Sequence, residues 1–305
     1  MNFTHRPVLS SEVVEHLAVK DPQVYIDLTS GGGGHAELFI SRYPKIKAVL
    51  IDRDLTAVDF LKNKFKDCSN VKVVKSNAGA LDKILFLLKI NRADIILADL
   101  GVSSHQLDTP SRGFSVKHDG LLDMRMDIEE TTTALDFLKK VSEKELKKIL
   151  SEYAQERESG RVARALKKAV SEGKKTTLEL AEIVKNTKRF FPRGIDPATQ
   201  VFMAIRMAVN NEMTELKKML ERSFATLSEN GKMGVITFHS TEDRVVKNFF
   251  KDRKDLLPYY IEDKVDNIVP AGKVKVYKPV LPSEKEIEKN PRSRSAKLRI
   301  LEKNY

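Results

Sequence analysis

The sequence predicts an α/β protein with a doubly wound, mostly parallel sheet and an inserted all-helical subdomain. Short runs rich in valine and isoleucine alternate with helical stretches through the first hundred residues, which is typical of parallel strands joined by crossover helices. From about Thr132 to Val209 the pattern is helical, without a strand-like run. A buried-strand pattern returns at Met233–Phe238, so we expect the sheet to resume after the insertion.

The elements follow in order from these patterns. The predicted strands are Val24–Leu28, Ala48–Ile51, Val71–Val74, Ala93–Ala98, Met233–Phe238, Val274–Tyr277 and Lys297–Leu301. The predicted helices of the sheet domain are Ala57–Phe65, Leu81–Leu88 and Asn211–Leu227, the last stopped by Asn230-Gly231. Within the insertion, capping boxes at Ser142 and Thr176 open helices, and Pro192, Gly194 and Pro197 mark a loop. Pro258, Pro270, Pro279 and Pro282 interrupt the region between the last strands. We therefore expect a sheet domain of residues 1–108 and 208–305 around an insertion of residues 109–207.

The composition limits the class of protein. Of the 305 residues, 41% are hydrophobic and 32% charged, which permits a sizeable core and excludes global disorder. The net charge of +11 predicts an anionic partner, nucleic acid or an anionic membrane, with solubility alone as the plain alternative. A single cysteine, Cys68, excludes an intramolecular disulfide and a multi-cysteine zinc site, and the six histidines lack zinc-ligand spacing, so no metal is expected. No membrane-spanning run and no signal sequence are recognisable, so we expect a cytoplasmic protein.

Acidic residues stand where three predicted strands end. The first strand ends at Asp27 and runs into Gly31–Gly34, the second ends at Asp52, and the fourth ends at Asp99. Ligands of open α/β sheets bind beyond the carboxyl ends of the strands, and an acid about 20 residues after the glycines suits ribose hydroxyls. The pattern favours a nucleoside ligand, either NAD or S-adenosylmethionine (SAM). Asp54 either binds the ligand in place of Asp52 or is the N-cap of the next helix. The alternative to a ligand site is that these acids are simply solvated strand ends.

Six separated motifs carry a resemblance to a known family. They are DLGVSSHQLD over Asp99–Asp108, RGFS over Arg112–Ser115, LDMRMD over Leu122–Asp127, PAT over Pro197–Thr199, FHSTEDR over Phe238–Arg244 and NPRSRSAKLR over Asn290–Arg299. With His5 and Pro7–Leu9 at the start, the chain resembles, over nearly its whole length, the bacterial 16S ribosomal RNA (cytosine-N4) methyltransferases of the RsmH/MraW family.

The resemblance implies a Rossmann-like, class I SAM-dependent methyltransferase. It implies methylation of the exocyclic N4 amine of a cytosine in 16S ribosomal RNA, in the decoding region of the small ribosomal subunit, with S-adenosylhomocysteine as the second product. The cofactor contacts that it implies are Gly33, Gly34, His35, Asp52, Ala78, Asp99 and Gln106. The family often has an aromatic residue near position 78, whose stacking an alanine cannot reproduce.

The reaction implied by this resemblance requires a hydrogen-bond acceptor beside the amine, because the nitrogen lone pair is delocalised into the cytosine ring. Positioning can supply roughly 7–11 kcal/mol of the barrier, so we expect it to dominate. Asp99 is expected at the junction of SAM and base, where it accepts from the cytosine amine or holds the SAM amino group. Asp123 is expected close by, and Ser103 is a candidate for orienting the base.

The target base must leave its stack, and the RNA must be held by its backbone. We expect Phe114 either to stack on the flipped base or to belong to the core. Arg112 and Arg125 are expected either to contact phosphates or to pair with nearby aspartates. Arg161 and Arg164 lie on a basic helical stripe, for which a solvated face is the alternative. Arg292 and Arg294 belong to a compact basic tail, which is a stronger candidate for RNA binding than the helical stripe.

Two other functions remain open at this stage. A nicotinamide-dependent oxidoreductase explains Gly31–Gly34 and Asp52, but not the basic charge. A non-catalytic RNA-binding or assembly factor on the same fold is the second. A hydrolase is excluded because no elbow motif surrounds Ser240, which more plausibly starts a helix. We expect the assembled small subunit as substrate, and the sequence leaves monomer or homodimer undecided.

Overall fold

The computed structural model describes residues 7–190, 196–254 and 273–304. They form two compact units: the sheet unit, up to Gly101 and from Glu215 onward, and the helical unit, Val102–Thr214. The insertion predicted from the sequence, residues 109–207, is about seven residues shorter at each end than the observed helical unit. The difference arises partly because Val102 and Leu107 pack in the apolar cluster of the helical unit.

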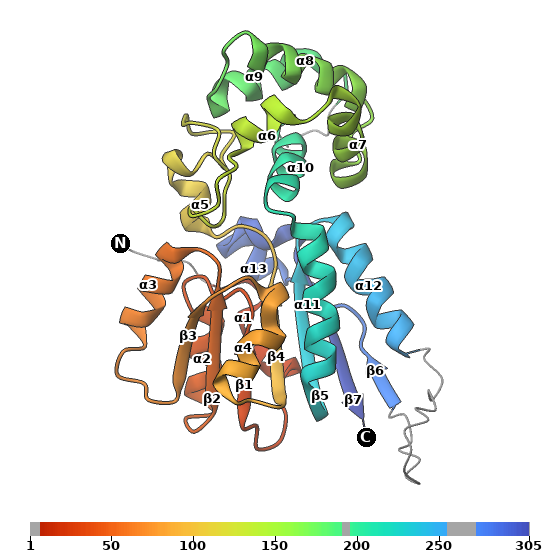
Figure 1. The fold of residues 1–305 in the computed structure, drawn as a ribbon. Helices are drawn as coiled ribbons and strands as arrows, with labels where there is room; N and C mark the ends of the chain where they lie inside the picture. Colours follow the sequence, from red (N-terminus) through yellow and green to blue (C-terminus); the bar gives the residue numbers. More distant parts are fainter. Residues whose placement is uncertain (1–6, 191–195, 255–272, 305) are drawn as a thin grey trace, which may run out of the picture. The chain divides into compact units, whose positions relative to one another are not determined.

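The sheet unit contains seven strands in the order β3-β2-β1-β4-β5-β7-β6 (Figure 1). The strands are β1 (Val24–Asp27), β2 (Lys47–Asp52), β3 (Val71–Lys75), β4 (Ala93–Asp99), β5 (Leu227–Thr237), β6 (Lys273–Val276) and β7 (Lys297–Asn304). The first five run parallel, whereas β7 is antiparallel to both β5 and β6. The predicted mostly parallel sheet is confirmed, and each predicted strand is present.

Helices bury both faces of this sheet. They are α1 (Ser10–His16), α2 (Gly34–Arg42), α3 (Leu55–Lys64), α4 (Leu81–Leu88), α11 (Glu212–Thr226, which begins in the helical unit), α12 (Ser240–Lys254) and α13 (Glu284–Lys289), with 3-10 turns η1 (Ala78–Ala80) and η3 (Pro291–Ser295). The neighbouring residues Tyr25 and Ile26 point to opposite faces and are both fully buried. Burial on both faces explains why the strands are continuous apolar runs rather than alternating ones.

The Asn230-Gly231 pair lies inside β5, so its prediction as a helix stop is wrong. Helix α11 ends at Thr226, and β5 begins directly after it. Between the pairs Ala93–Leu227 and Ile95–Lys232, β5 advances five residues while β4 advances two. Asn230 has φ +57° there, a conformation that asparagine adopts more readily than most residues. The pair therefore forms a bulge in the strand.

The helical unit has its own apolar core. Its helices are α5 (Ser104–Asp108), α6 (Ala134–Lys140), α7 (Glu143–Ala154), α8 (Ser159–Ser171), α9 (Thr177–Thr187) and α10 (Thr199–Val209), with the 3-10 turn η2 (Pro110–Arg112). Leu146, Leu150 and Leu166 are fully buried between these helices. The capping box at Thr176 is complete, whereas Ser142 shows only the bond from the Glu145 backbone N–H. Pro192, Gly194, Pro258 and Pro270 lie outside the described residues.

Candidate functional site

Three carboxyl groups gather at one edge of the sheet unit. Strand β1 lies between β2 and β4, and its last residue, Asp27, pairs with Leu50 on one side and Leu97 on the other. Asp52 and Asp99 therefore stand two residues beyond Asp27 on the flanking strands. The structure thus brings the three predicted acidic strand ends together.

The glycine-rich loop after β1 is tied to both neighbouring strands. The Gly31 N–H donates to Asp52 Oδ2 at 2.8 Å, and the Asp99 N–H donates to Thr29 Oγ1 at 2.7 Å. Gly33 caps α2 with φ +70°, and a Cβ there would come within 2.7 Å of a Leu61 methyl carbon. The loop therefore requires glycine at this position, and its backbone passes close to the acidic edge.

Asp52 and Asp54 have separate roles. The Asp54 side chain accepts from the Thr56 N–H at 3.0 Å and is the N-cap of α3. Asp52 accepts the Gly31 N–H with one oxygen and the Asp54 N–H, at 2.8 Å, with the other. Of the two acids, Asp52 is therefore the one placed beside the loop.

Burial makes these carboxyl groups reluctant to ionise. It raises the pKa of Asp27 to about 7, although hydrogen bonds from the Thr29 N–H and the Tyr25 hydroxyl act in the opposite direction. Burial also raises the pKa of Asp52 to about 6. The pKa of Asp99 is raised well above its ordinary range by burial and by the charges of Asp27 and Glu242. A bound cation would favour the ionised forms of all three.

Asp99 presents an unused acceptor at this edge. Its Oδ1 atom is buried and has no hydrogen-bond partner among the described residues. Buried polar atoms are normally satisfied, so an atom of this kind at a strand end indicates a ligand group that donates. SAM fits this requirement because its ammonium and its ribose hydroxyls donate hydrogen bonds.

The other predicted cofactor residues in the sheet unit are placed differently. The His35 imidazole is buried, and its Nε2 lies 2.9 Å from the Val8 carbonyl oxygen, so this ring nitrogen bonds to the chain's own backbone. Its backbone lies in the first turn of α2. Ala78 begins the turn η1, which is capped by the Asn77 side chain.

Ser103 and Gln106, both in the helical unit, bond to each other. The Ser103 hydroxyl accepts the Gln106 N–H at 3.2 Å, and Gln106 Oε1 accepts the Ser103 N–H at 3.0 Å. This capping box opens α5. The Ser103 hydroxyl oxygen thus caps α5, and its O–H remains a donor, so its base-orienting role stays a prediction.

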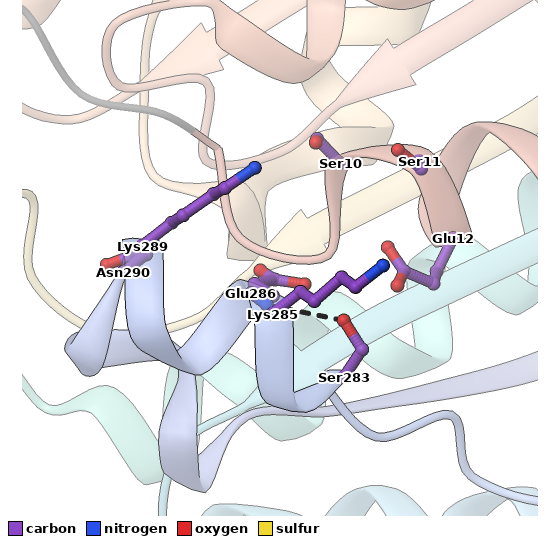
Figure 2. A pocket seen from close by; sticks show the side chains of 8 residues that line it. All are labelled: Ser10, Ser11, Glu12, Ser283, Lys285, Glu286, Lys289 and Asn290. Atoms are coloured by element: carbon purple, nitrogen blue, oxygen red, sulfur yellow. Dashed lines mark hydrogen bonds between the residues drawn. The ribbon is translucent and has the colours of Figure 1, made fainter.

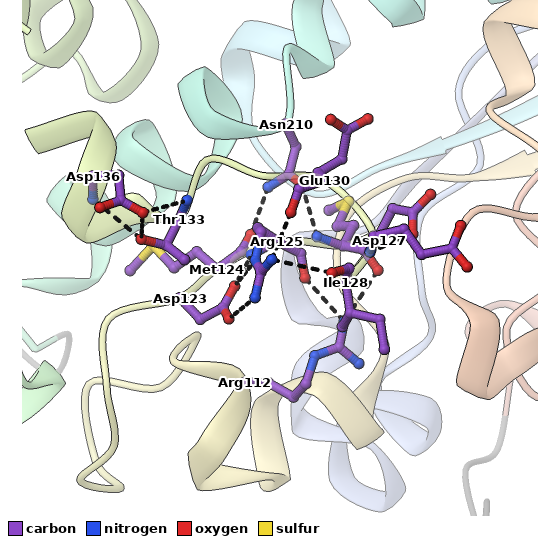
Figure 3. Close-up of polar contacts among 12 residues, drawn as sticks. Arg112, Asp123, Met124, Arg125, Asp127, Ile128, Glu130, Thr133, Asp136 and Asn210 are labelled. Carbon is purple, nitrogen blue, oxygen red and sulfur yellow. Dashed lines mark hydrogen bonds and ion pairs between the residues drawn. The ribbon is translucent and has the colours of Figure 1, made fainter. Parts of the chain in front are cut away.

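Asp123 is held in a bidentate ion pair within the helical unit. The Arg125 guanidinium donates to its two carboxylate oxygens at 2.7 and 2.6 Å and also to the carbonyl oxygens of Ile128 and Glu130 (Figure 3). Asn210 fixes the same loop from α10, since its amide donates to the Met124 carbonyl and accepts the Met126 N–H. Residues 123–130 are thus a rigid loop rather than a set of free acids and bases.

Two predicted RNA contacts are corrected by burial. Phe114 is 6% exposed within the core of the helical unit, so it cannot stack on a flipped base in this conformation. The Arg112 guanidinium is also buried and donates to the carbonyl oxygens of Arg125 and Met126. Arg125 pairs with an aspartate, Asp123, which is the second of its two predicted roles. Arg112 and Arg125 thus stabilise the loop of Figure 3.

The remaining predicted RNA contacts lie at the surface. Arg161 pairs with Glu158 at 2.7 Å and Arg164 with Glu143 at 3.3 Å, and both arginines are substantially exposed. Exposed ion pairs of this kind are weak, so they leave the arginines available to a polyanion. Arg292 and Arg294 are exposed on η3.

Several residues of the two sites escaped the sequence analysis. Thr29, Tyr25 and Glu242 support the acidic edge, and Asn210 anchors the loop of the helical unit. Helix α12 begins at Ser240 as predicted, but Glu242 is the acid that accepts the Phe238 N–H, at 2.9 Å. The FHSTEDR motif contains Glu242 without indicating which acid turns inward, and the family resemblance extends to Asn210 without indicating that its amide anchors the loop.

The described residues contain neither a metal-binding cluster nor a helix that could span a membrane. No group of three or more His, Cys, Asp or Glu side chains in residues 7–190, 196–254 and 273–304 is arranged to hold a metal ion. Every helix in the same ranges is too short or too polar to span a bilayer.

The strand order, the antiparallel β7 and the acidic, glycine-lined edge together define a class I SAM-dependent methyltransferase, a Rossmann-like fold. The chain belongs to the MraW methylase family, whose family model matches residues 2–304. The resemblance seen in the sequence motifs is therefore confirmed.

Relatives match the chain from end to end. A protein of Caldicellulosiruptor saccharolyticus named ribosomal RNA small subunit methyltransferase H is 42% identical over 305 residues, 99% of each chain. Proteins of the same name are 41% identical over 304 residues in Coprothermobacter proteolyticus, covering 98% of this chain and 96% of the relative, and 42% identical over 308 residues in Carboxydothermus hydrogenoformans, covering 99% of both.

Proposed function

We propose that this protein transfers the methyl group of SAM to the N4 amine of a cytosine in 16S ribosomal RNA, in the decoding region of the small subunit. The observation that carries the proposal is the buried acidic edge with the unpartnered Asp99 oxygen. The names of the relatives support small-subunit ribosomal RNA as the substrate. The amine and its position in the RNA come from the motif resemblance.

The sheet unit would hold the cofactor with its three strand ends. When bound, SAM supplies an electrophilic methyl group on a positively charged sulfur. Asp52, already oriented by the Gly31 and Asp54 N–H groups, has lone pairs left for ribose hydroxyls. The backbone of Gly33 and Gly34 allows close approach, and Asp27 and Asp99 place negative charge at the edge where a cation would lie.

Asp99 would also receive the hydrogen of the target amine. Accepting an N–H localises the nitrogen lone pair as the new N–C bond forms and the C–S bond breaks, and the proton lost from nitrogen then passes to Asp99 or to water. Its raised pKa suits a group that takes up a proton. Asp123 was an alternative acceptor, but its ion pair with Arg125 leads us to assign it to holding the loop.

Membership of the methylase family overturns the nicotinamide oxidoreductase alternative. The non-catalytic RNA-binding factor remains as an outcome of the experiment. We propose that the helical unit contributes to substrate recognition, and that the assembled small subunit is preferred to naked RNA. Equal methylation rates on both RNAs would contradict that preference.

The experiment is methyl transfer from labelled SAM to small ribosomal subunits isolated from a strain that lacks the related enzyme. Nucleoside analysis should place the label in N4-methylcytidine. Asp99→Ala should reduce the rate by at least about 100-fold, since a positioned base contributes roughly 10²–10⁴. Asp59→Ala, at an exposed position of α3, is the matched control and should retain full activity. Near-normal transfer by Asp99→Ala would refute the role of Asp99, and SAM binding without transfer to any RNA would indicate a non-catalytic factor.

A further inference from the structure

Helix α12 carries its positive charge on one exposed face. The helix contains five basic and three acidic residues. At about 100° of rotation per residue, four of the basic residues fall within an arc of roughly 80°. All four are exposed, and we call this row the α12 stripe: Arg244, Lys247, Lys251 and Lys254. The stripe extends about 15 Å along the helix.

The acidic residues of α12 do not neutralise the stripe. Glu242 is only 3% exposed, so its carboxylate belongs to the interior of the sheet unit. Asp243 is held by the Arg299 guanidinium, which donates to both of its oxygens, and by the Lys297 amine. Asp252 is exposed, but it lies roughly 80–160° around the helix from the residues of the stripe. The face that carries the stripe is therefore cationic.

The stripe has no counter-ion within residues 7–190, 196–254 and 273–304. None of its four side chains forms an ion pair, a hydrogen bond or a ring contact with these residues. Arg253, the fifth basic residue of α12, differs because it pairs with Glu221 and lies over the rings of Phe224 and Phe249. Like charges three or four residues apart destabilise a helix, so an uncompensated row of four indicates a surface that meets an anion.

Two other basic surfaces contain acids among their lysines and arginines. On α8, Arg161 and Arg164 each pair with a glutamate. The surface cavity between α1 and α13 is lined by two lysines together with two glutamates (Figure 2). Such surfaces carry little net charge, whereas the α12 stripe contributes four charges that the described chain leaves uncompensated.

The stripe begins beside the acidic edge of the sheet unit. Helix α12 follows directly on β5, which pairs with β4 as far as Asp99, and Glu242 in its first turn is close enough to raise the pKa of Asp99. Asp243, next to Arg244, binds Lys297 at the start of β7, and the turn η3 with the predicted basic tail directly precedes that strand. From this edge the stripe continues along α12, away from the strand ends (Figure 1).

We propose that the α12 stripe binds the phosphate backbone of the RNA substrate next to the target cytosine, an inference that rests on the proposed function. Consecutive phosphates carry one negative charge each and accept hydrogen bonds from guanidinium and ammonium groups whatever the base sequence. A row of cations about 15 Å long matches a short run of one strand rather than an isolated anion. The RNA strand is thus held along the sheet unit while the flipped cytosine reaches Asp99.

The experiment measures binding of a small-subunit ribosomal RNA fragment to the full chain at several salt concentrations. In the test variant, all four residues of the α12 stripe are replaced by glutamine. The slope of log affinity against log salt should decrease by about 3, because each phosphate contact to a single strand contributes about 0.7, and affinity at physiological salt should fall about 100-fold. In methyl transfer to small subunits, the loss should appear in KM rather than in kcat.

The control variant carries the same change of charge at four exposed lysines elsewhere in the sheet unit: Lys20→Gln, Lys45→Gln, Lys62→Gln and Lys66→Gln. It should keep its RNA affinity within about threefold, because charges that touch no phosphate act only through screened attraction. Both variants should bind SAM as the wild type does, since none of the replaced residues lies at the acidic edge.

Equal losses of RNA affinity in the two variants would overturn the proposal, because net charge alone would then explain the binding. Stripe-dependent binding to vesicles of anionic phospholipid, with RNA binding intact in the test variant, would identify a membrane surface and would also overturn it. Failure of the wild-type chain to bind or methylate the RNA would instead refute the proposed function, so the two failures are distinguishable.

Discussion

Asp27 shows how burial tunes a side chain at the candidate cofactor edge. It is buried beside the Tyr25 hydroxyl and the Thr29 N–H, and its pKa is raised from the ordinary value of 3.8 to about 7. The folded state therefore holds its proton more tightly than the unfolded state does. The contribution of Asp27 to the stability of the ligand-free protein is therefore fully present below about pH 4 and is lost as the pH rises toward 7.

Asp27→Asn should stabilise the ligand-free protein at neutral and alkaline pH. The amide keeps one oxygen to accept the Thr29 N–H, its NH2 group can donate to the Tyr25 hydroxyl, and it carries no charge to bury, so we expect a gain of about 2 kcal/mol in unfolding free energy at pH 8 and almost none at pH 4. Urea unfolding at several pH values measures this. The control is Asp59→Asn, at an exposed site, which should show no such trend. A gain that is equal at pH 4 and pH 8 would contradict the assignment.

At the scale of single elements, side chains decide where each helix and strand begins or bends. Thr176 and Glu179 close a capping box at α9, and Asp54 caps α3, both as their sequence spacing indicates. Asn230 acts in the opposite way, because its positive φ bends β5 without ending it. The same dipeptide could serve as a helix stop, and only the pairing with β4 makes it a bulge.

Asn230→Val should destabilise the protein by about 1–2 kcal/mol, because a β-branched residue is strained at positive φ. Asn230→Gly should remain within about 0.5 kcal/mol of the wild type. Glu229→Val is the matched control, since Glu229 is an exposed neighbour in β5 without positive φ. Denaturant unfolding of the three variants compares them. Equal stability of both valine variants would show that the bulge stores no strain.

At the scale of the whole molecule, each unit has a core of its own. Phe39 and Leu50 belong to the apolar cluster of the sheet unit, and Leu146 and Leu166 belong to that of the helical unit. The candidate cofactor edge, with Asp27, Asp52 and Asp99, belongs entirely to the sheet unit. A ligand at this edge should therefore stabilise the two units unequally.

SAM at about 100 times its Kd should stabilise the sheet unit by about 2.7 kcal/mol. We expect amide hydrogen exchange to slow most in residues 27–35, 52–54 and 97–101, with little change in α8 and α9. S-adenosylhomocysteine, which lacks the sulfonium charge, is the comparison ligand. Slowing confined to the helical unit would refute the location of the cofactor site.

The sequence alone determined the strands, most helices, the order of sheet and insertion, and the acidic strand ends, because local periodicity and capping residues encode them. The tertiary structure alone decided which polar side chains are free to act. It turned Phe114 and Arg112 inward, paired Asp123 with Arg125, and joined Ser103 to Gln106. It also joined α12 to β7 through Asp243 and Arg299, which leaves the α12 stripe without acidic partners among the described residues. Composition and spacing predict burial and secondary structure, but a side chain's partner depends on segments that meet only after the chain has folded.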